Sequence, residues 1–305
     1  MSGAAVARRP EASTAAGLAP EPDRTGRVLG LARGRFHALA YTDWGDERAE
    51  RAAICVHGLS RQARDFDVLA SRLVGLGYRV VCPDLPGRGR SDRLPDADDY
   101  ALPQYTADMA AVIARVNRPQ VDWIGTSLGG LVGIVLAGMP NSPIRRLVIN
   151  DIGPYLPLNA LRRIGDAVRR APGFFADLDA AQAWYREALS PYGTLTDEQW
   201  AHITRHSLLR EEGGWRQHHD PAIASVFSFS WVYNLNLWRY WDQIRCPVLV
   251  LRGEHSDLLL PKVTMEMAER GPRAEVVEVP GVGHCPALMD EAQIRLVTDW
   301  LERTG

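Results

Sequence analysis

Ser127 stands between glycines in the stretch GTSLGG, residues 125–130, which directly follows the apolar run VDWI and directly precedes the apolar run LVGIVLAGMP. A strand that turns straight into a helix forces the central residue of the turn into a strained backbone conformation. Gly125 and Gly129 remove the Cβ atoms that would clash in such a turn. The pattern G-x-S-x-G is typical of a nucleophile elbow, which raises a serine hydroxyl above a sheet at a helix N-terminus. Ser127 is therefore a candidate nucleophile, and an ordinary tight loop is the alternative.

Two other residues, each just beyond a strand-like run, could activate that hydroxyl. A serine needs a base, usually a histidine, that is itself oriented by a carboxylate. In an elbow architecture these groups follow the serine in the order Asp or Glu, then His, on loops at the C-terminal edge of the sheet. Asp257 follows the run CPVLVLRG, and His284 follows the run AEVVEVP. The chemistry that this order indicates is nucleophilic catalysis.

The elements that must hold these residues alternate between strand-like and helix-like stretches. The strand-like runs are RAAICVHG, YRVVCPD, VDWIGTS, RRLVIND, CPVLVLRG and AEVVEVP. This alternation predicts an α/β fold with a mainly parallel sheet flanked by helices, and an antiparallel entry around residues 34–41. Residues 154–242 break the rhythm, have no convincing strand and hold most of the tryptophans, so they predict a helical cap. Residues 1–26 read as a flexible tail, which leaves 27–153 and 243–305 as the core.

Composition excludes several other functional classes. The 305 residues are 46% hydrophobic and 24% charged, with a formal net charge of −2, which favours neither nucleic acid nor an anionic membrane as a partner. The sequence has no apolar run of about 18 residues, the length that spans a bilayer. The four cysteines show no C-x-x-C spacing. We expect a soluble protein with reduced thiols, and a cytoplasmic location.

The chain resembles the α/β-hydrolase family, in its cap-bearing serine hydrolase branch. The resemblance spans about residue 28 to the C-terminus and rests on HGLS, PDLPGRGRSD, GTSLGG, the Asp257 loop and GVGHCP. It implies that Ser127 is the nucleophile, that His284 is the general base and acid, and that Asp257 orients His284. The family often has its acid three residues after the loop glycine, where this chain has Ser256, and Asp257 is preferred for its spacing to Pro261. Asp151, at the end of RRLVIND, is the rival acid.

Acyl transfer also needs N–H donors for an oxyanion. The resemblance implies that the backbone N–H groups of Leu59 and Leu128 supply them. His57, in the same loop as Leu59, is interpreted as a structural histidine and not as a second base.

Further residues could bind the substrate. Arg61 and Arg64 could hold a substrate carboxylate, and ion pairs with Asp65 or Asp67 are the alternative. Apolar side chains from the run VFSFSWVYNLNLW should line an acyl pocket, with cap packing as the alternative; the candidates are Phe227, Phe229 and Trp231. His202 and His206 stand four residues apart but lack the glutamate of H-E-x-x-H, so we expect no metal and no cofactor.

The expected activity is hydrolysis of a small to medium carboxylic ester through a Ser127 acyl-enzyme. Two alternatives share the triad and the cap: a carbon–carbon bond hydrolase of ring-cleavage products, and a lactonase or hydroxyacid-oligomer hydrolase. A ligand receptor on a hydrolase scaffold is the non-enzymatic alternative. The expected partner is a small-molecule ester, and the sequence leaves the oligomeric state open.

Overall fold

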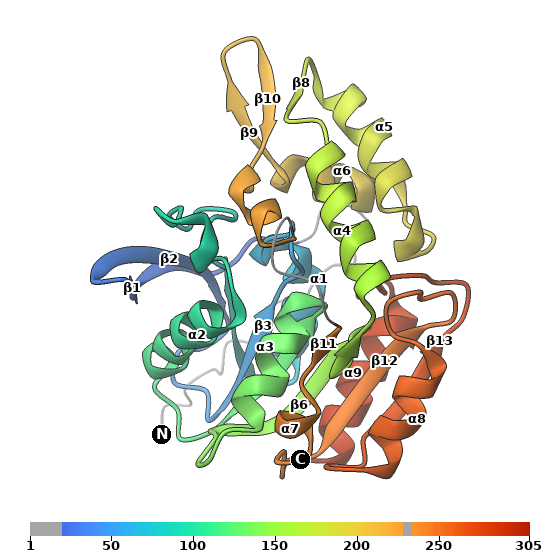
Figure 1. The fold of residues 1–305 in the computed structure, drawn as a ribbon. Coiled ribbons are helices and arrows are strands. Elements are labelled where there is room, and N and C mark those ends of the chain that lie inside the picture. Colours follow the sequence, from blue (N-terminus) through green and yellow to red (C-terminus); the bar gives the residue numbers. More distant parts are fainter. Residues whose placement is uncertain (1–19, 228–233) are drawn as a thin grey trace, which may run out of the picture.

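A single eight-stranded sheet organises the computed structural model, which describes residues 20–227 and 234–305 (Figure 1). Its strand order is β1-β2-β4-β3-β5-β6-β12-β13. The strands are β1 (Arg24–Ala32), β2 (Arg35–Trp44), β3 (Arg51–Val56), β4 (Tyr78–Pro83), β5 (Val121–Thr126), β6 (Ile144–Asn150), β12 (Val248–Gly253) and β13 (Glu275–Val279). β1 and β2 pair antiparallel, β2 joins β4 antiparallel, and the other neighbours are parallel. The predicted α/β fold with an antiparallel entry is confirmed.

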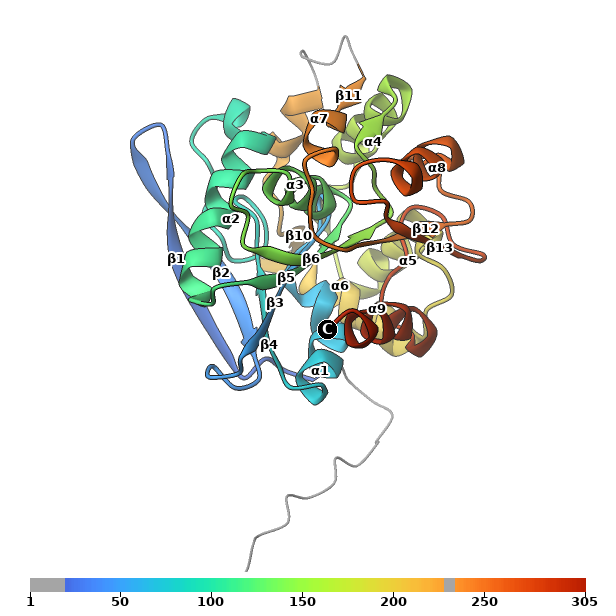
Figure 2. The same ribbon diagram turned by 90° about the horizontal axis from the view of Figure 1, so that it is seen from below.

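Helices cover both faces of this sheet. Figure 2 shows α1 (Asp67–Gly75) and α9 (Glu291–Arg303) on one face, and α2 (Leu102–Val116), α3 (Leu128–Ala137) and α8 (Pro261–Glu269) on the other. Successive residues of β3 point to opposite faces of the sheet. Ala53 and Cys55 pack in the core on the side of α1 and α9, and Ile54 and Val56 pack in the core on the other side. Burial on both faces explains why the central strands are apolar without alternation.

Most of the segment between β6 and β12 lies over the end of the sheet where Ser127 emerges, whereas its last helix, at residues 238–241, lies beside the C-terminal end of α3 (Figure 1). It contains β7 (Tyr155–Leu156), α4 (Leu158–Arg170), β8 (Phe174–Phe175), α5 (Leu178–Ala188), η3 (Ser190–Tyr192), α6 (Asp197–His206), β9 (Leu208–Glu211), β10 (Gly214–Gln217), η4 (Pro221–Phe227), β11 (Leu235–Asn236) and α7 (Trp238–Trp241). β7 pairs antiparallel with β11, so the segment leaves and rejoins the core at adjacent points. We refer to residues 154–242 as the insertion.

One boundary and the make-up of the insertion differ from the sequence expectations. β1 begins at Arg24, so the strand takes the last three residues assigned to the tail. The insertion is not purely helical, because β8, β10 and β9 form a small antiparallel sheet. Each of these strands has at most four residues, too short for a period-2 pattern to be visible. Within the described residues, no helix is long and apolar enough to cross a membrane.

Candidate active site

The turn between β5 and α3 has the geometry that the sequence predicts. Ser127 lies between the last residue of β5 and the first of α3, with φ 49° and ψ −111°. A Cβ atom at Gly125 would collide with the carbonyl of Gly129, and one at Gly129 would collide with the carbonyl of Val56. Glycine is therefore required at both positions for the sharp turn. The turn leaves the hydroxyl of Ser127 at the N-terminus of α3, facing a cavity.

His284 connects this hydroxyl to a buried carboxylate. Its Nε2 lies 3.0 Å from Oγ of Ser127, and its Nδ1 lies 2.6 Å from Oδ2 of Asp151. Asp151 follows β6, has φ 54° and is completely buried. An ionised carboxylate only accepts hydrogen bonds, so Nδ1 carries the proton and Nε2 is free to accept the hydroxyl proton of Ser127. The arrangement is that of a nucleophile, a base and an orienting acid.

Asp257, which we expected to be the acid, does not contact His284. Its side chain is 58% exposed and forms an ion pair of 2.7 Å with Arg163 of α4. The expectation is wrong because position 256, and not 257, turns inward. Oγ of Ser256 donates to Oδ2 of Asp151 at 2.6 Å, and the N–H of Gly253 donates to Oδ1 at 2.8 Å.

The loop after β3 is held from two sides. Nε2 of His57 accepts the N–H of Leu85 at 2.9 Å, so Nδ1 donates to the carbonyl of Gly58 at 2.7 Å. Burial lowers the pKa of His57 to about 3, which keeps it neutral. Arg88 donates from Nε to the carbonyl of Leu59 at 2.8 Å and from another nitrogen to the hydroxyl of Tyr105 at 2.8 Å. His57 is therefore a structural histidine, and Arg88 fixes the loop that carries the N–H of Leu59.

Leu59 and Leu128 both line a cavity of about 260 Å³ together with Ser127. The other lining residues come from the core and from the insertion, and they include Leu131, Ile152, Leu156, Leu161, Ile164, Leu235 and Leu258. Of the two lining tyrosines, Tyr100 donates its hydroxyl proton to Asp220, and the hydroxyl of Tyr105 accepts a hydrogen bond from Arg88. The cavity thus offers an apolar surface beside one reactive hydroxyl.

Of the predicted substrate-binding residues, the structure describes the side chain of Arg61, which does not line the cavity. Arg61 is buried, but its guanidinium makes two hydrogen bonds of 2.7 Å to Asp65 and one of 2.9 Å to Ser207. Arg64 pairs with Asp67 at 2.6 Å. Neither arginine lines the cavity beside Ser127, so the expected role of Arg61 as a carboxylate ligand is not supported. Phe229 and Trp231 lie outside the described residues, as does the side chain of Phe227, whose backbone ends η4.

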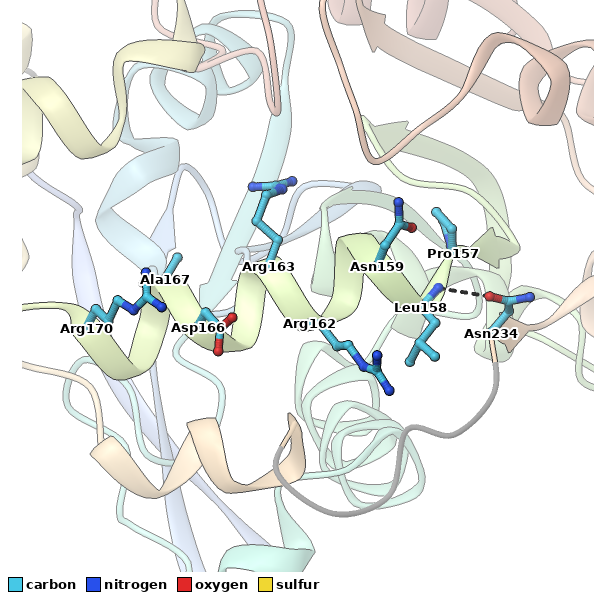
Figure 3. A pocket seen from close by; sticks show the side chains of 9 residues that line it. All are labelled: Pro157, Leu158, Asn159, Arg162, Arg163, Asp166, Ala167, Arg170 and Asn234. Atoms are coloured by element: carbon cyan, nitrogen blue, oxygen red, sulfur yellow. Dashed lines mark hydrogen bonds between the residues drawn. The ribbon is translucent and has the colours of Figure 1, made fainter.

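A second, open groove of about 750 Å³ lies on the outer side of α4 (Figure 3). It is lined by Pro157, Leu158, Asn159, Arg162, Arg163, Asp166, Ala167, Arg170 and Asn234. Ser127 and His284 are not among these residues. α4 therefore lies between this open groove and the cavity beside Ser127, to which Leu161 and Ile164 belong.

One cluster of side chains has the composition of a metal site. Asp67, His202 and His206 place possible ligand atoms within 4.8 Å of one another, at the contact of α1 with α6. The fold supplies Asp67, which is distant in the sequence from the two histidines. However, Arg64 already donates to Oδ2 of Asp67, and its carbonyl lies 2.9 Å from Nε2 of His202. In this conformation the cluster joins the insertion to the core through hydrogen bonds.

Asn150 and Ser256 are site residues that the sequence did not indicate as such. The carbonyl of Asn150 accepts the N–H of Ser127 at 2.9 Å, and its side-chain amide donates to the carbonyl of Pro286 at 2.8 Å. Asn150 thereby ties the nucleophile turn to the loop that carries His284. Its place directly before Asp151 at the end of β6 was the available signal.

Comparisons with known proteins agree with this geometry. The chain matches the Alpha/beta hydrolase family over residues 53–296. It is 44% identical over 282 residues to a 3-hydroxybutyrate-oligomer hydrolase of Cupriavidus necator, covering 90% of this chain and 96% of that protein. An esterase of Mycobacterium tuberculosis is 29% identical over 245 residues, covering 76% and 75%. A solved α/β hydrolase of Novosphingobium aromaticivorans has a TM-score of 0.80 at 31% identity, covering 92% and 98%. The chain is a hydrolase and belongs to the α/β-hydrolase family.

Proposed function

We propose that this protein is a serine esterase that uses Ser127, His284 and Asp151 to cleave short esters of hydroxy acids. The observation that carries the proposal is the hydrogen-bonded series from Ser127 through His284 to Asp151 at the wall of an apolar cavity. A triad of this kind makes and breaks an acyl-enzyme.

The reaction has two steps. Ser127 Oγ attacks the ester carbonyl while its proton passes to Nε2 of His284, and the N–H groups of Leu59 and Leu128 receive the oxyanion. The intermediate collapses, and the alcohol leaves with the proton from His284. Water then attacks the acyl-enzyme, giving its proton to His284, and the acid leaves as Ser127 regains its proton. The buried charge of Asp151 stabilises the imidazolium that forms in each step.

The cavity supports an uncharged acyl group of modest size. It holds about 260 Å³, and within the described residues that line it there is no charged side chain. In an oligomer of 3-hydroxybutyrate the acyl part next to the cleaved bond is short and uncharged, and the free carboxylate belongs to the alcohol side. That carboxylate would remain outside the cavity. The 44% identity to a 3-hydroxybutyrate-oligomer hydrolase favours this substrate class over other esters.

The same cavity disfavours the carbon–carbon bond hydrolase alternative. Ring-cleavage products carry a carboxylate that needs a cationic partner close to the reacting carbon. Arg61, which could have supplied one, is committed to Asp65 and Ser207. Freeing Arg61 would remove two hydrogen bonds from Asp65, which is only partly exposed, and their loss would cost free energy.

A fluorophosphonate probe and a substrate panel test the proposal together. Wild-type protein should label covalently and hydrolyse linear dimers of 3-hydroxybutyrate and p-nitrophenyl butyrate. Ser127→Ala should lose labelling and lower kcat by about a millionfold, because the nucleophile is gone. Ser71→Ala, on the far side of the sheet in α1, is the matched control and should behave as wild type.

Two results would contradict the proposal. Turnover of a vinylogous diketone with no turnover of any ester would favour the carbon–carbon bond hydrolase. Tight binding of an ester without covalent labelling or turnover would favour a ligand receptor.

A further inference from the structure

The turn of the insertion that contains η3 lies against the loop that carries His284. The N–H of Gly283 donates to the carbonyl of Pro191 at 2.7 Å. A Cβ atom at Gly283 would lie only 2.8 Å from Cβ of Pro191, which is closer than two side chains normally approach. The insertion therefore contacts the backbone directly before His284.

The next residue of the insertion contacts the other neighbour of His284. The hydroxyl of Tyr192 donates a hydrogen bond to Sγ of Cys285, a residue that is 3% exposed. Burial raises the pKa of both groups, so at neutral pH the hydroxyl keeps the proton that it donates and the thiol stays uncharged. Two consecutive residues of the insertion, Pro191 and Tyr192, thus hold the residues on either side of His284.

The core holds the same loop from another direction. The side-chain amide of Asn150 donates to the carbonyl of Pro286 at 2.8 Å, and Nδ1 of His284 donates to Asp151. The distance from the imidazole to the hydroxyl of Ser127 depends on where this loop lies, because few side-chain torsions separate the ring from the backbone. A misplacement of about 1 Å can lower the rate of a reaction by about a hundredfold.

We propose that Tyr192 is a positioning residue for His284: its hydrogen bond to Cys285 places the histidine opposite Ser127, so that the triad works at its full rate only when the insertion is seated on the core. This inference rests on the proposed function, since it takes His284 as the base that activates Ser127. It assigns the insertion a part in the chemical step, in addition to its part in lining the cavity.

A double-mutant cycle tests this role with four proteins: wild type, Tyr192→Phe, Cys285→Ala and the variant that carries both changes. Tyr185→Phe is the matched control, because Tyr185 is a buried tyrosine of the insertion whose hydroxyl donates to the backbone carbonyl of Ser207 at 3.5 Å. The readouts are the rate of fluorophosphonate labelling of Ser127, kcat and KM for p-nitrophenyl butyrate, and the melting temperature. Labelling needs a base in place but no particular substrate.

Tyr192→Phe should lower the labelling rate and kcat by about fivefold with KM nearly unchanged, since one hydrogen bond that holds the base is lost while the cavity is kept. Tyr185→Phe should label at the wild-type rate. The double variant should label as fast as Cys285→Ala alone, because the hydroxyl has lost its partner once the thiol is gone. A hydroxyl that only stabilised the fold would change the melting temperature and leave the labelling rate of the folded protein unchanged.

Equal labelling rates for folded Tyr192→Phe and Tyr185→Phe would overturn the positioning role. So would losses that simply multiply in the double variant, because Tyr192 would then act by a route other than Cys285. If Tyr192→Phe does not fold, Cys285→Ala decides: it should show the same loss in labelling rate, and the wild-type rate would refute the proposal. Failure of the proposed function is distinguishable, since wild-type protein would then not label, or would label but hydrolyse no ester.

Discussion

At the scale of single residues, Asp151 carries the buried negative charge of the candidate site. Its carboxylate is completely buried and accepts hydrogen bonds from His284, Ser256 and the N–H of Gly253. The side chain of Asp257, in contrast, is 58% exposed and forms an ion pair with Arg163. Buried charges with several donors are costly to disturb, whereas exposed ion pairs contribute little.

Asp151→Asn should therefore lower kcat/KM by about ten-thousandfold, because the amide can donate to Nδ1 and favour the wrong tautomer of His284. Asp257→Asn should change kcat/KM by less than about twofold, since the lost ion pair is exposed. Initial rates with p-nitrophenyl butyrate measure both, and melting temperatures verify that each variant is folded. If Asp257→Asn were the more damaging of the two, the acid would be assigned to the wrong strand.

Ser127 and His284 were predictable from the sequence because each stands in a short motif that fixes its own backbone. The acid was not. Asp151 and Asp257 both follow strands and both satisfy the order serine, acid, histidine. The choice depends on which side chain turns inward, and that follows from β6 lying between β5 and β12 and from the positive φ of Asp151. Such a choice depends on tertiary contacts, which local spacing does not encode.

At the scale of elements, α4 forms a wall with two different faces. Leu161 and Ile164 line the cavity that contains Ser127. Arg162 and Arg163 line the open groove instead (Figure 3). The helical period of 3.6 residues places residues three apart on the same face, so a change at position 164 acts on the cavity and a change at position 162 acts on the groove.

Ile164→Phe should shorten the range of acyl chains that the enzyme accepts. The larger ring takes up part of a cavity of only about 260 Å³, so kcat/KM should fall more for p-nitrophenyl octanoate than for p-nitrophenyl acetate. Arg162→Ala is the matched control on the outer face and should leave the ratio of the two rates unchanged. If the ratio of kcat/KM for the two esters changed equally in both variants, this cavity would not determine which acyl chain lengths are accepted.

The elements of the core were predictable, whereas those of the insertion were predictable only in part. The central strand β3 is a continuous apolar run after its first residue, since helices cover both faces of the sheet. The β8–β10–β9 sheet has no comparable signal: only Phe175 and Leu208 in it belong to the buried apolar cluster that it shares with α5. Its pairing depends on packing against the rest of the insertion.

At the scale of the whole molecule, several neutral histidines lie near the contact between the insertion and the core. His57 belongs to the core, and His218 and His219 belong to the insertion; all three are buried. Nδ1 of His218 accepts the N–H of Gly89 at 2.7 Å, which links the two parts directly. Burial, together with Arg88 and Arg61, lowers the pKa of His219 to about 4. Folding therefore keeps these side chains uncharged at neutral pH.

This predicts that acid weakens the fold, and His219 allows the contribution of one group to be measured. In the unfolded chain a histidine takes up a proton near its ordinary pKa of about 6.5, whereas His219 in the folded protein does so near about 4. The unfolded state thus binds more protons between these values, so the stabilisation is complete above about pH 6.5 and is lost as the pH falls toward about 4. Asp67 acts in the opposite direction, because burial raises its pKa to about 7 and its protonation favours the fold as the pH falls.

A comparison of wild type with His219→Asn separates these contributions, since Asp67 is present in both proteins. The free energy of unfolding is measured with urea at about pH 7 and at about pH 5, and it should fall less between these values for His219→Asn than for wild type. The two slopes can differ by at most about 1.4 kcal/mol per pH unit, because one histidine takes up one proton. Asn is uncharged throughout this range, so the difference between the two proteins reports the protonation of His219 alone. Parallel pH dependences in the two proteins would mean that His219 is protonated as readily in the folded chain as in the unfolded one, and the buried contact between insertion and core would then have to be open to water.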